Sequence, residues 1–125
     1  MKNNSYIAKL IFFLFVTTNL SANNLEISST EVKLDKKESK IILKGNIKAK
    51  DQNNNILKAE EANYLKDKDL LNSIGFTTII TSENYLFESS NVIFDNKNKI
   101  IKSDFPTKIL DPDGNIISVK MFNYN

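Results

Sequence analysis

Few side chains in this 125-residue chain could carry out covalent or acid–base chemistry. The sequence contains no histidine, no cysteine and no arginine, which removes imidazole bases, thiolate nucleophiles, zinc sites and arginine clamps. Serine and lysine can together act as nucleophile and base, but no flanking motif marks any such pair. We therefore expect no catalytic residue, no metal site, no cofactor and no enzymatic activity.

Two acidic segments remain as candidates for a metal or proton-transfer site. The loop Asp111-Pro112-Asp113-Gly114-Asn115 is rich in oxygen ligands, but it lacks the alternating ligands and the distal glutamate of an EF-hand. The same residue types are typical of a turn, since Asp and Asn bond their own backbone and Gly accepts positive φ. Glu60 and Glu61 are adjacent, and we interpret them as a solvated pair. Neither segment predicts a site.

The dominant pattern of the sequence is a period of 30 residues. Apolar residues recur at this spacing in three columns of four: Ile27, Leu57, Phe87 and Ile117; Val32, Ala62, Val92 and Phe122; Leu34, Tyr64, Phe94 and Tyr124. Polar stretches recur in the same register. A fixed period of this size predicts one supersecondary unit stacked on itself.

Within each unit the apolar residues alternate with polar ones. Residues 41–50 place their apolar side chains at odd positions, with Lys44 and Lys48 on the opposite face. The parity then changes at the same place in each unit, which predicts a bend or bulge there. The polar stretches 51–55, 95–99 and 111–115 read as turns. Each unit is therefore expected to contain two strands of roughly nine residues.

A helix is the alternative for residues 57–71, where Ala, Glu and Lys are common. The equivalent residues 87–101 are rich in β-branched and aromatic side chains. Because the repeat requires one conformation for both segments, we favour strands in each.

The first 22 residues have the three-part plan of a secretory signal peptide. Lys2 and Lys9 make a weakly basic start, residues 10–16 form an apolar run, and a short polar stretch ends at Ala22. The run is shorter than the ~20 residues of a spanning helix, although an uncleaved membrane anchor is the alternative. We expect cleavage after Ala22, leaving a β domain over residues 23–125. That domain has as many acidic residues as lysines, which argues against nucleic acid as a partner.

The apolar face of such a sheet must be buried, either in a packed core or around an apolar ligand. The shared register and parity predict an interior face made of these residues: Ile41, Leu43, Ile47, Leu57, Tyr64, Phe87, Phe94, Ile101, Ile109, Ile117 and Phe122. Small residues, among them Ala49, Gly45 and Gly75, lie between the large ones, and such gaps would leave room for acyl chains.

Residues 25–124 resemble the OstA-like family of periplasmic lipopolysaccharide-transport domains. The resemblance is carried by Val32-Lys33-Leu34-Asp35, by residues 41–49 and 57–64, and by Gly75. It implies an all-β fold, a V-shaped, taco-like jellyroll of stacked antiparallel strands built from about 30-residue repeats and open at both ends. Phe105 departs from the pattern because it takes the place of a glycine. The fourth unit is incomplete, so the domain is either a short bridging protein or the front of a larger outer-membrane assembly protein.

The resemblance also implies a function and partners. It implies a periplasmic module whose interior face shields the lipid A acyl chains of lipopolysaccharide. Unpaired edges at Ile27 and at Met121–Asn125 predict strand pairing with other OstA-like transport components, or head-to-tail self-association. Two alternatives stay open: a structural spacer or adhesin-like module with a dry core, and a membrane-anchored component of the same transport system.

Overall fold

The computed structural model describes residues 7–8, 12–14 and 25–125, and within them the chain is all-β. One short 3₁₀ turn, η1 (Lys66–Lys68), is the only helical element of this part of the chain. The strands are β1 (Ile7–Ala8), β2 (Phe12–Leu14), β3 (Glu26–Ser29), β4 (Glu31–Asp35), β5 (Lys40–Lys50), β6 (Ile56–Leu65), β7 (Leu70–Ile80), β8 (Leu86–Ser90), β9 (Ile93–Asp95), β10 (Ile100–Ser103), β11 (Thr107–Leu110), β12 (Ile116–Val119) and β13 (Phe122–Tyr124).

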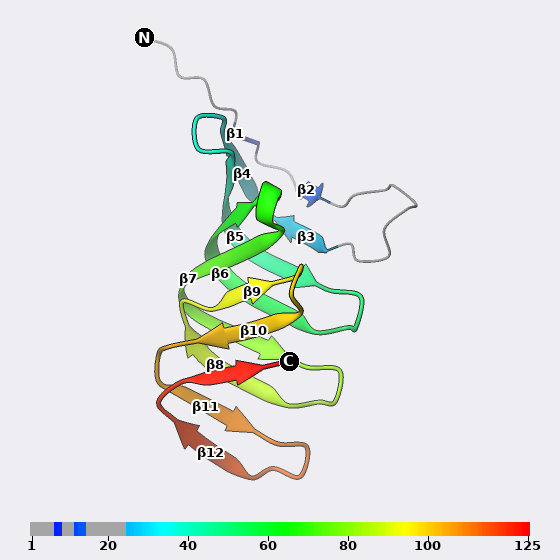
Figure 1. Cartoon of the computed structure of the whole chain (residues 1–125), viewed down its shortest axis with the longest axis vertical. Coiled ribbons are helices and arrows are strands. Elements are labelled where there is room, and N and C mark those ends of the chain that lie inside the picture. Colours follow the sequence, from blue (N-terminus) through cyan, green and yellow to red (C-terminus); the bar gives the residue numbers. More distant parts are fainter. Residues whose placement is uncertain (1–6, 9–11, 15–24) are drawn as a thin grey trace.

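The strands form one antiparallel sheet that folds into a V without closing into a barrel (Figure 1). We call its two halves the first wall and the second wall. The first wall contains β3, β8, β11 and β12, and the second wall contains β4, β9, β10 and β13. The long strands β5, β6 and β7 run through both walls and bend between them. The predicted fold class is confirmed.

The bends come from backbone that L-residues seldom adopt. Gly45, Asn46 and Gly75 have φ of 85°, 47° and 83°, and the pairing register shifts beside them, between Lys44 and Ile47. The Thr30 N–H donates to the Gly45 carbonyl at 2.8 Å, so the bend of one strand is tied to the bend of its neighbour. The predicted change of parity lies in β6 between Ala59 and Ala62, where the register shifts against both β5 and β7, so apolar side chains stay inward on both walls.

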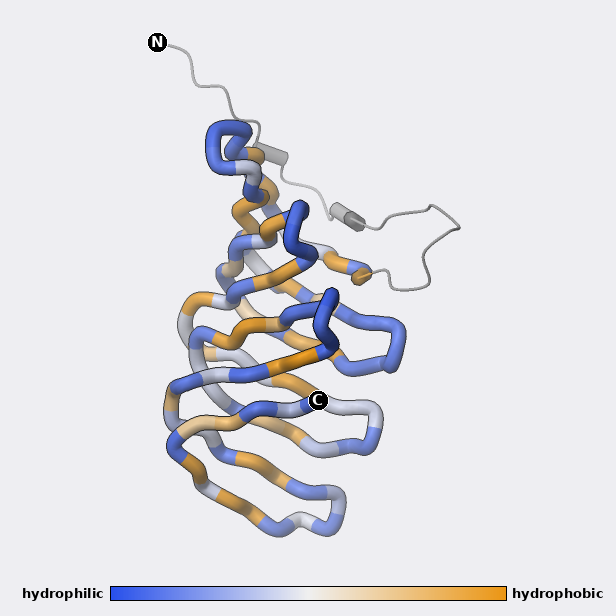
Figure 2. Tube along the Cα trace, in the orientation of Figure 1, coloured by the Kyte–Doolittle hydropathy of each residue, from blue (hydrophilic) through white to orange (hydrophobic). Residues whose placement is uncertain are grey.

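The open side of the V, which we call the mouth, is lined by the turns of both walls. Hydropathy follows this division, with apolar residues along the strands and polar ones in the turns (Figure 2). Three turns of the first wall share one hydrogen-bond pattern, in which the first residue donates to the fifth: Asp51 to Asn55 at 3.1 Å, Thr81 to Tyr85 at 2.9 Å, and Asp111 to Asn115 at 3.0 Å. The loop 111–115 is thus a turn, as predicted.

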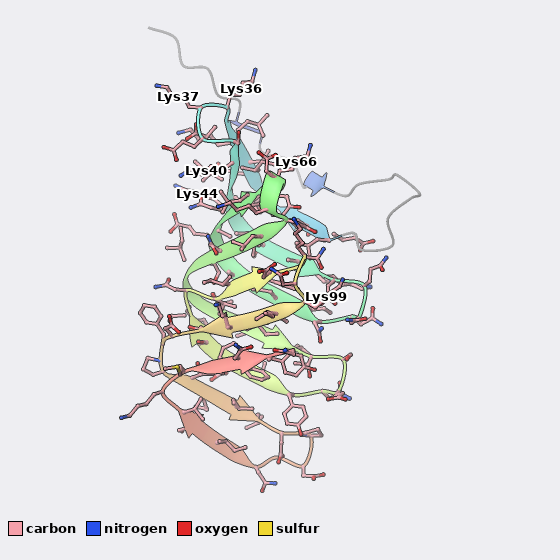
Figure 3. The ribbon with its side chains drawn as sticks, viewed as in Figure 1. Lys36, Lys37, Lys40, Lys44, Lys66 and Lys99 are labelled. Carbon is pink, nitrogen blue, oxygen red and sulfur yellow. The ribbon has the colours of Figure 1, made fainter. Side chains whose placement is uncertain are left out.

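The structure also settles the orientation of charged residues on the strands. Lys44 and Lys48 are exposed on the outer surface, as the alternation predicted. Figure 3 shows Lys44 with other lysines at the surface of the upper half of the sheet. Glu60 and Glu61 are only partly the solvated pair that we expected. The Glu61 carboxylate lies 3.6 Å from the Lys44 ammonium, and Glu60 accepts a hydrogen bond from the Asn46 N–H at 3.3 Å. The helical alternative for residues 57–71 is wrong, because β6 and β7 occupy this range on either side of η1.

The expected signal peptide falls mostly outside the described residues. Its described parts, β1 and β2, pair antiparallel with β4 and β3. Ile27 in β3 therefore has a neighbouring strand on both sides while β2 is present, and the edge predicted at Ile27 for the chain cleaved after Ala22 stays a prediction. In the part of the chain that the structure describes, no helix is long and apolar enough to cross a membrane.

The two strand glycines offer a test of the bend. A Cβ at Gly45 would lie 2.9 Å from the Thr30 Cβ, whereas one at Gly75 would meet nothing within 4 Å. Gly75→Ala should cost about 1–2 kcal/mol for the positive φ alone. Gly45→Ala should cost about 1–3 kcal/mol more, because Thr30 must move. Urea denaturation of both variants measures the difference, and equal losses would contradict the tie between the bends.

Candidate functional site

The candidate site is the interior of the V, which is lined on each wall by two columns of inward side chains. The columns nearer the mouth are large and almost entirely apolar. Cross-strand register fixes their order: Ile27, Ala49, Leu57, Ile79, Phe87, Ile109 and Ile117 on the first wall, and Leu34, Ile41, Tyr64, Leu71, Phe94, Ile101 and Tyr124 on the second wall. These two columns face each other across the V and make most of its apolar lining.

The columns nearer the bends change character along the molecule. They begin with apolar residues such as Leu43 and Ile47 and continue with buried hydroxyl side chains in the lower half. Each hydroxyl has a partner: Thr77 Oγ1 donates to Ser73 Oγ at 2.7 Å, and Ser89 Oγ lies 2.7 Å from Thr107 Oγ1. Because these groups are satisfied internally, they line the interior without attracting water. The sequence pattern could not reveal these inward hydroxyl side chains, because a search for periodic apolar residues treats Ser and Thr as interruptions.

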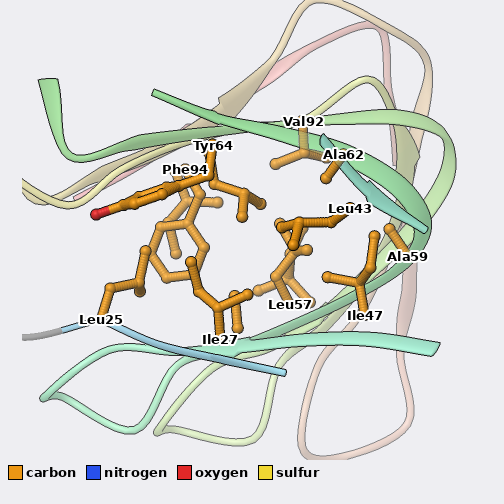
Figure 4. Packing of buried hydrophobic residues seen from close by; sticks show 14 of the residues in the cluster. Leu25, Ile27, Leu43, Ile47, Leu57, Ala59, Ala62, Tyr64, Val92 and Phe94 are labelled. Atoms are coloured by element: carbon orange, nitrogen blue, oxygen red, sulfur yellow. The ribbon is translucent and has the colours of Figure 1, made fainter. Parts of the chain in front are cut away.

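The upper half of the interior is filled by the protein's own side chains. Leu43, Leu57 and Leu71 have no exposed surface, and Phe94 is 1% exposed. Figure 4 shows Leu43, Leu57 and Phe94 between the walls, with Leu25 and Ile27 on the side of β3. Such a close-packed region has no room for a ligand unless the walls separate.

The lower half is open toward solvent at the last strands. Ile117 continues the inward column of the first wall, yet it remains 45% exposed. Phe122 and Tyr124 of the second wall are half-buried and contact Phe87 of the first wall, with ring centroids 4.7 Å and 5.8 Å apart. These aromatic contacts join the two walls below the filled core. Below them, no described side chain covers Ile117, so this end of the interior is an accessible apolar surface.

The predicted interior set is placed inward along its whole length, but with unequal burial. Eight of its members are buried: Ile41, Leu43, Ile47, Leu57, Tyr64, Phe87, Phe94 and Ile101. Ile109 and Phe122 pack against this core while partly exposed, and Ile117 is exposed at the open end. Gly45 and Gly75, which we expected to leave room between large residues, lie at the bends instead of inside.

The mouth above the filled core is crossed by polar contacts. Tyr64 donates its phenolic proton to Asp69 at 2.7 Å, and the Asn96 amide donates to the second Asp69 oxygen at 2.7 Å. Burial raises the pKa of Tyr64, and the Asp69 hydrogen bond and charge raise it further, so the phenol stays protonated at neutral pH. Asp51 and Asn55 from the first wall line a hollow of about 40 Å³ together with Asn96. The turns of the two walls thus face each other there.

Among the described residues, no cluster of carboxylates and other ligands could hold a metal ion. The Asp111 carboxylate accepts hydrogen bonds from the Asn115 side chain at 2.9 Å and from the Asn115 backbone N–H at 2.8 Å. These bonds lower the pKa of Asp111 below its ordinary value, with the side-chain bond as the larger cause. The Asp111 carboxylate therefore stabilises the turn formed by residues 111–115.

Comparisons with known proteins found no match for this chain. No protein-family model matches the chain, no curated protein matches it, and no solved structure matches it. The resemblance to the OstA-like family therefore stays a prediction from the sequence motifs.

The contrast between the two halves of the interior can be measured by truncation. Leu43→Ala should lower the free energy of unfolding by about 2–5 kcal/mol, because it empties a fully buried site. Ile117→Ala should cost less than about 1 kcal/mol, because that side chain is already 45% exposed. Chemical denaturation of the two variants provides the comparison. A large loss from Ile117→Ala would mean that the lower end is covered in solution.

Proposed function

We propose that this protein is a periplasmic lipopolysaccharide-binding module that shields lipid A acyl chains inside the V and passes them toward the outer-membrane assembly machinery. The observation that carries the proposal is the inward apolar column that ends uncovered at Ile117, Phe122 and Tyr124. Burying a methylene group of an acyl chain against apolar side chains is favourable whether those side chains are aliphatic or aromatic. This lining therefore suits an acyl chain. The motif resemblance supplies the identity of the lipid.

The geometry limits where such a lipid can lie. In the upper half Leu43, Leu57 and Leu71 already occupy the space between the walls. An acyl chain there would have to displace side chains that hold the fold together, at a cost of several kcal/mol. At the lower end it would cover surface that is already exposed. We therefore place the acyl-binding part of the interior between Phe87 and Ile117.

A structural spacer is the second candidate, and the filled upper core favours it. A stack whose interior is occupied by its own side chains needs no ligand to be stable. In that case the exposed lower end would serve only as the surface against which a further unit packs. The two candidates differ in whether the inward side chains below Phe87 meet lipid.

Site-specific photocrosslinking separates the candidates. A photoreactive amino acid would replace Ile117 or Phe122, which face inward, or Ser118 or Asn123, their outward neighbours. With purified lipopolysaccharide we expect adducts at the inward positions and none at the outward positions. The matched pairs lie one residue apart on the same strand and differ in the face of the sheet to which they point.

Two outcomes would contradict lipid binding in the interior. Absence of adducts at both inward positions, with the protein folded, would leave the spacer as the function. Equal adducts at Ser118 and Asn123 would show adsorption of lipopolysaccharide to the outer surface.

The end strands suggest how the module would join its partners. Within the described residues, β12 pairs only with β11, and β13 pairs only with β10, so each leaves one row of backbone groups unpaired. At the opposite end, removal of residues 1–22 would take away β1 and β2 and leave β3 and β4 as edges. Such edges can template a strand of another OstA-like component or of a second copy. A head-to-tail contact of this kind is heterologous and can extend into a filament.

Edge pairing predicts association that depends on concentration. Light scattering of the purified protein should show a mass that rises with concentration. Ile116→Lys combined with Asn123→Lys places outward lysines on both end strands and should return the protein to a monomer. Asn63→Lys combined with Ile80→Lys adds the same charge to central strands and should leave association unchanged. A monomer at all concentrations in the parent protein would contradict the prediction.

A further inference from the structure

Charged residues on the outer surface of the sheet are arranged in pairs of opposite sign. Five cross-strand pairs follow this pattern: Glu26 with Lys50, Glu31 with Lys44, Asp35 with Lys40, Glu61 with Lys44, and Glu88 with Lys108. Two of them are in contact, since the Lys44 ammonium lies 3.6 Å from Glu61 and the Lys108 ammonium lies 3.8 Å from Glu88. Opposite charges at directly opposed positions stabilise a sheet, so the pattern has an ordinary physical cause.

One pair breaks the pattern. Lys48 of β5 lies directly opposite Lys58 of β6, and both side chains are exposed on the outer face of the first wall. Like charges in this position are destabilising. Neither lysine belongs to any of the ion pairs found among the described residues. The Cβ atoms of opposed residues are only about 5 Å apart, so both ammonium groups can reach one anion.

The two lysines border a groove of about 410 Å³ on the outer surface. Thr78 of β7, the next residue in register after Lys58, lies on the same side and offers a hydroxyl donor. Ile47 and Ala59 also border the groove, but their side chains are buried in the interior, so its apolar surface comes from Phe76, which is 65% exposed. Cationic donors therefore lie beside an apolar surface within one hollow.

We propose that this groove binds an organic phosphate, with the phosphate group between Lys48 and Lys58 and the apolar or ring portion of the ligand against Phe76. A phosphate monoester carries a charge of about −1.5 to −2 at neutral pH and offers three acceptor oxygens, which suits two ammonium groups and a hydroxyl. The groove lies on the outer face of the wall. It is therefore separate from the proposed acyl-binding interior and does not depend on it.

The carboxylates closest to the groove have partners of their own. Glu60 also lines the groove, and its side chain accepts the Asn46 N–H at 3.3 Å on the side of the bend. Glu88, which is opposite Thr78 in register, faces the Lys108 ammonium at 3.8 Å. The two ammonium groups outnumber the single carboxylate that lines the groove, which leaves a net positive charge for an external anion.

Phenyl phosphate and inorganic phosphate are suitable soluble probes. Each would be titrated into the purified protein at about 0.15 M salt, with backbone NMR shifts as the readout. We expect saturable shifts at Lys48, Lys58, Phe76 and Thr78, and tighter binding of phenyl phosphate than of inorganic phosphate. Lys48→Gln combined with Lys58→Gln should weaken binding about tenfold or more, since two charge-assisted hydrogen bonds are lost.

A matched control removes two lysines elsewhere. Lys33→Gln combined with Lys102→Gln lowers the charge equally on the outer face of the second wall and should leave the affinity unchanged. Lys58→Glu turns the pair into opposite charges. It should abolish binding while raising the melting temperature by about 1–4 °C, which shows that the loss does not come from unfolding.

Lipid vesicles distinguish the source of the phosphate. Cosedimentation with phosphatidylglycerol vesicles that is lost in the Lys48/Lys58 variant would identify a membrane headgroup as the ligand, whereas binding of phenyl phosphate alone would identify a soluble ester. Absence of binding to every probe would overturn the proposal. So would equal weakening in the two double variants, because that result would show attraction to net charge without a site.

Discussion

The bend in each long strand is the constraint on which the structure depends. A regular strand alternates its side chains, and the sheet of this protein must turn sharply between two walls while the same set of side chains stays inside. The bulges at Gly45, Asn46 and Gly75 meet both conditions, since their positive φ turns the chain and shifts the register by an odd number of residues. Without that shift, the alternation of β6 would turn Glu61 and Asn63 toward the other wall.

Stacking follows from the bend. Each repeat crosses the V twice, so 30 residues advance the structure by two strands, or about 9.6 Å. The bends and turns then fall in rows along the molecule, and neighbouring rows bond to one another, as Ser82 does when its N–H donates to the Asn55 side chain at 3.0 Å. The interior is consequently a continuous slot whose contents can change from layer to layer while the backbone stays nearly constant.

The sequence was informative about features that repeat within one strand. The strands, the inward face and the change of parity could all be read from positions such as Leu57 and Tyr64, because side-chain direction depends only on local alternation. Features that depend on the partner strand could not be read in this way. The like-charge pair of Lys48 and Lys58 exists only in the observed register, and Thr107, the partner of Ser89, lies in another strand.

The same apolar columns that build the core also make the proposed binding surface, and this creates a competition. A side chain that is fully buried contributes its transfer free energy to folding, and a lipid can gain nothing more from it unless the walls part. An inward side chain left exposed contributes less to folding and is available to a ligand. Leu43 and Ile117 are the two extremes of one repeating structure, at 0% and 45% exposure. Binding and stability can therefore coexist in this fold only if different layers supply them, with the filled upper half holding the walls in place around the open lower half.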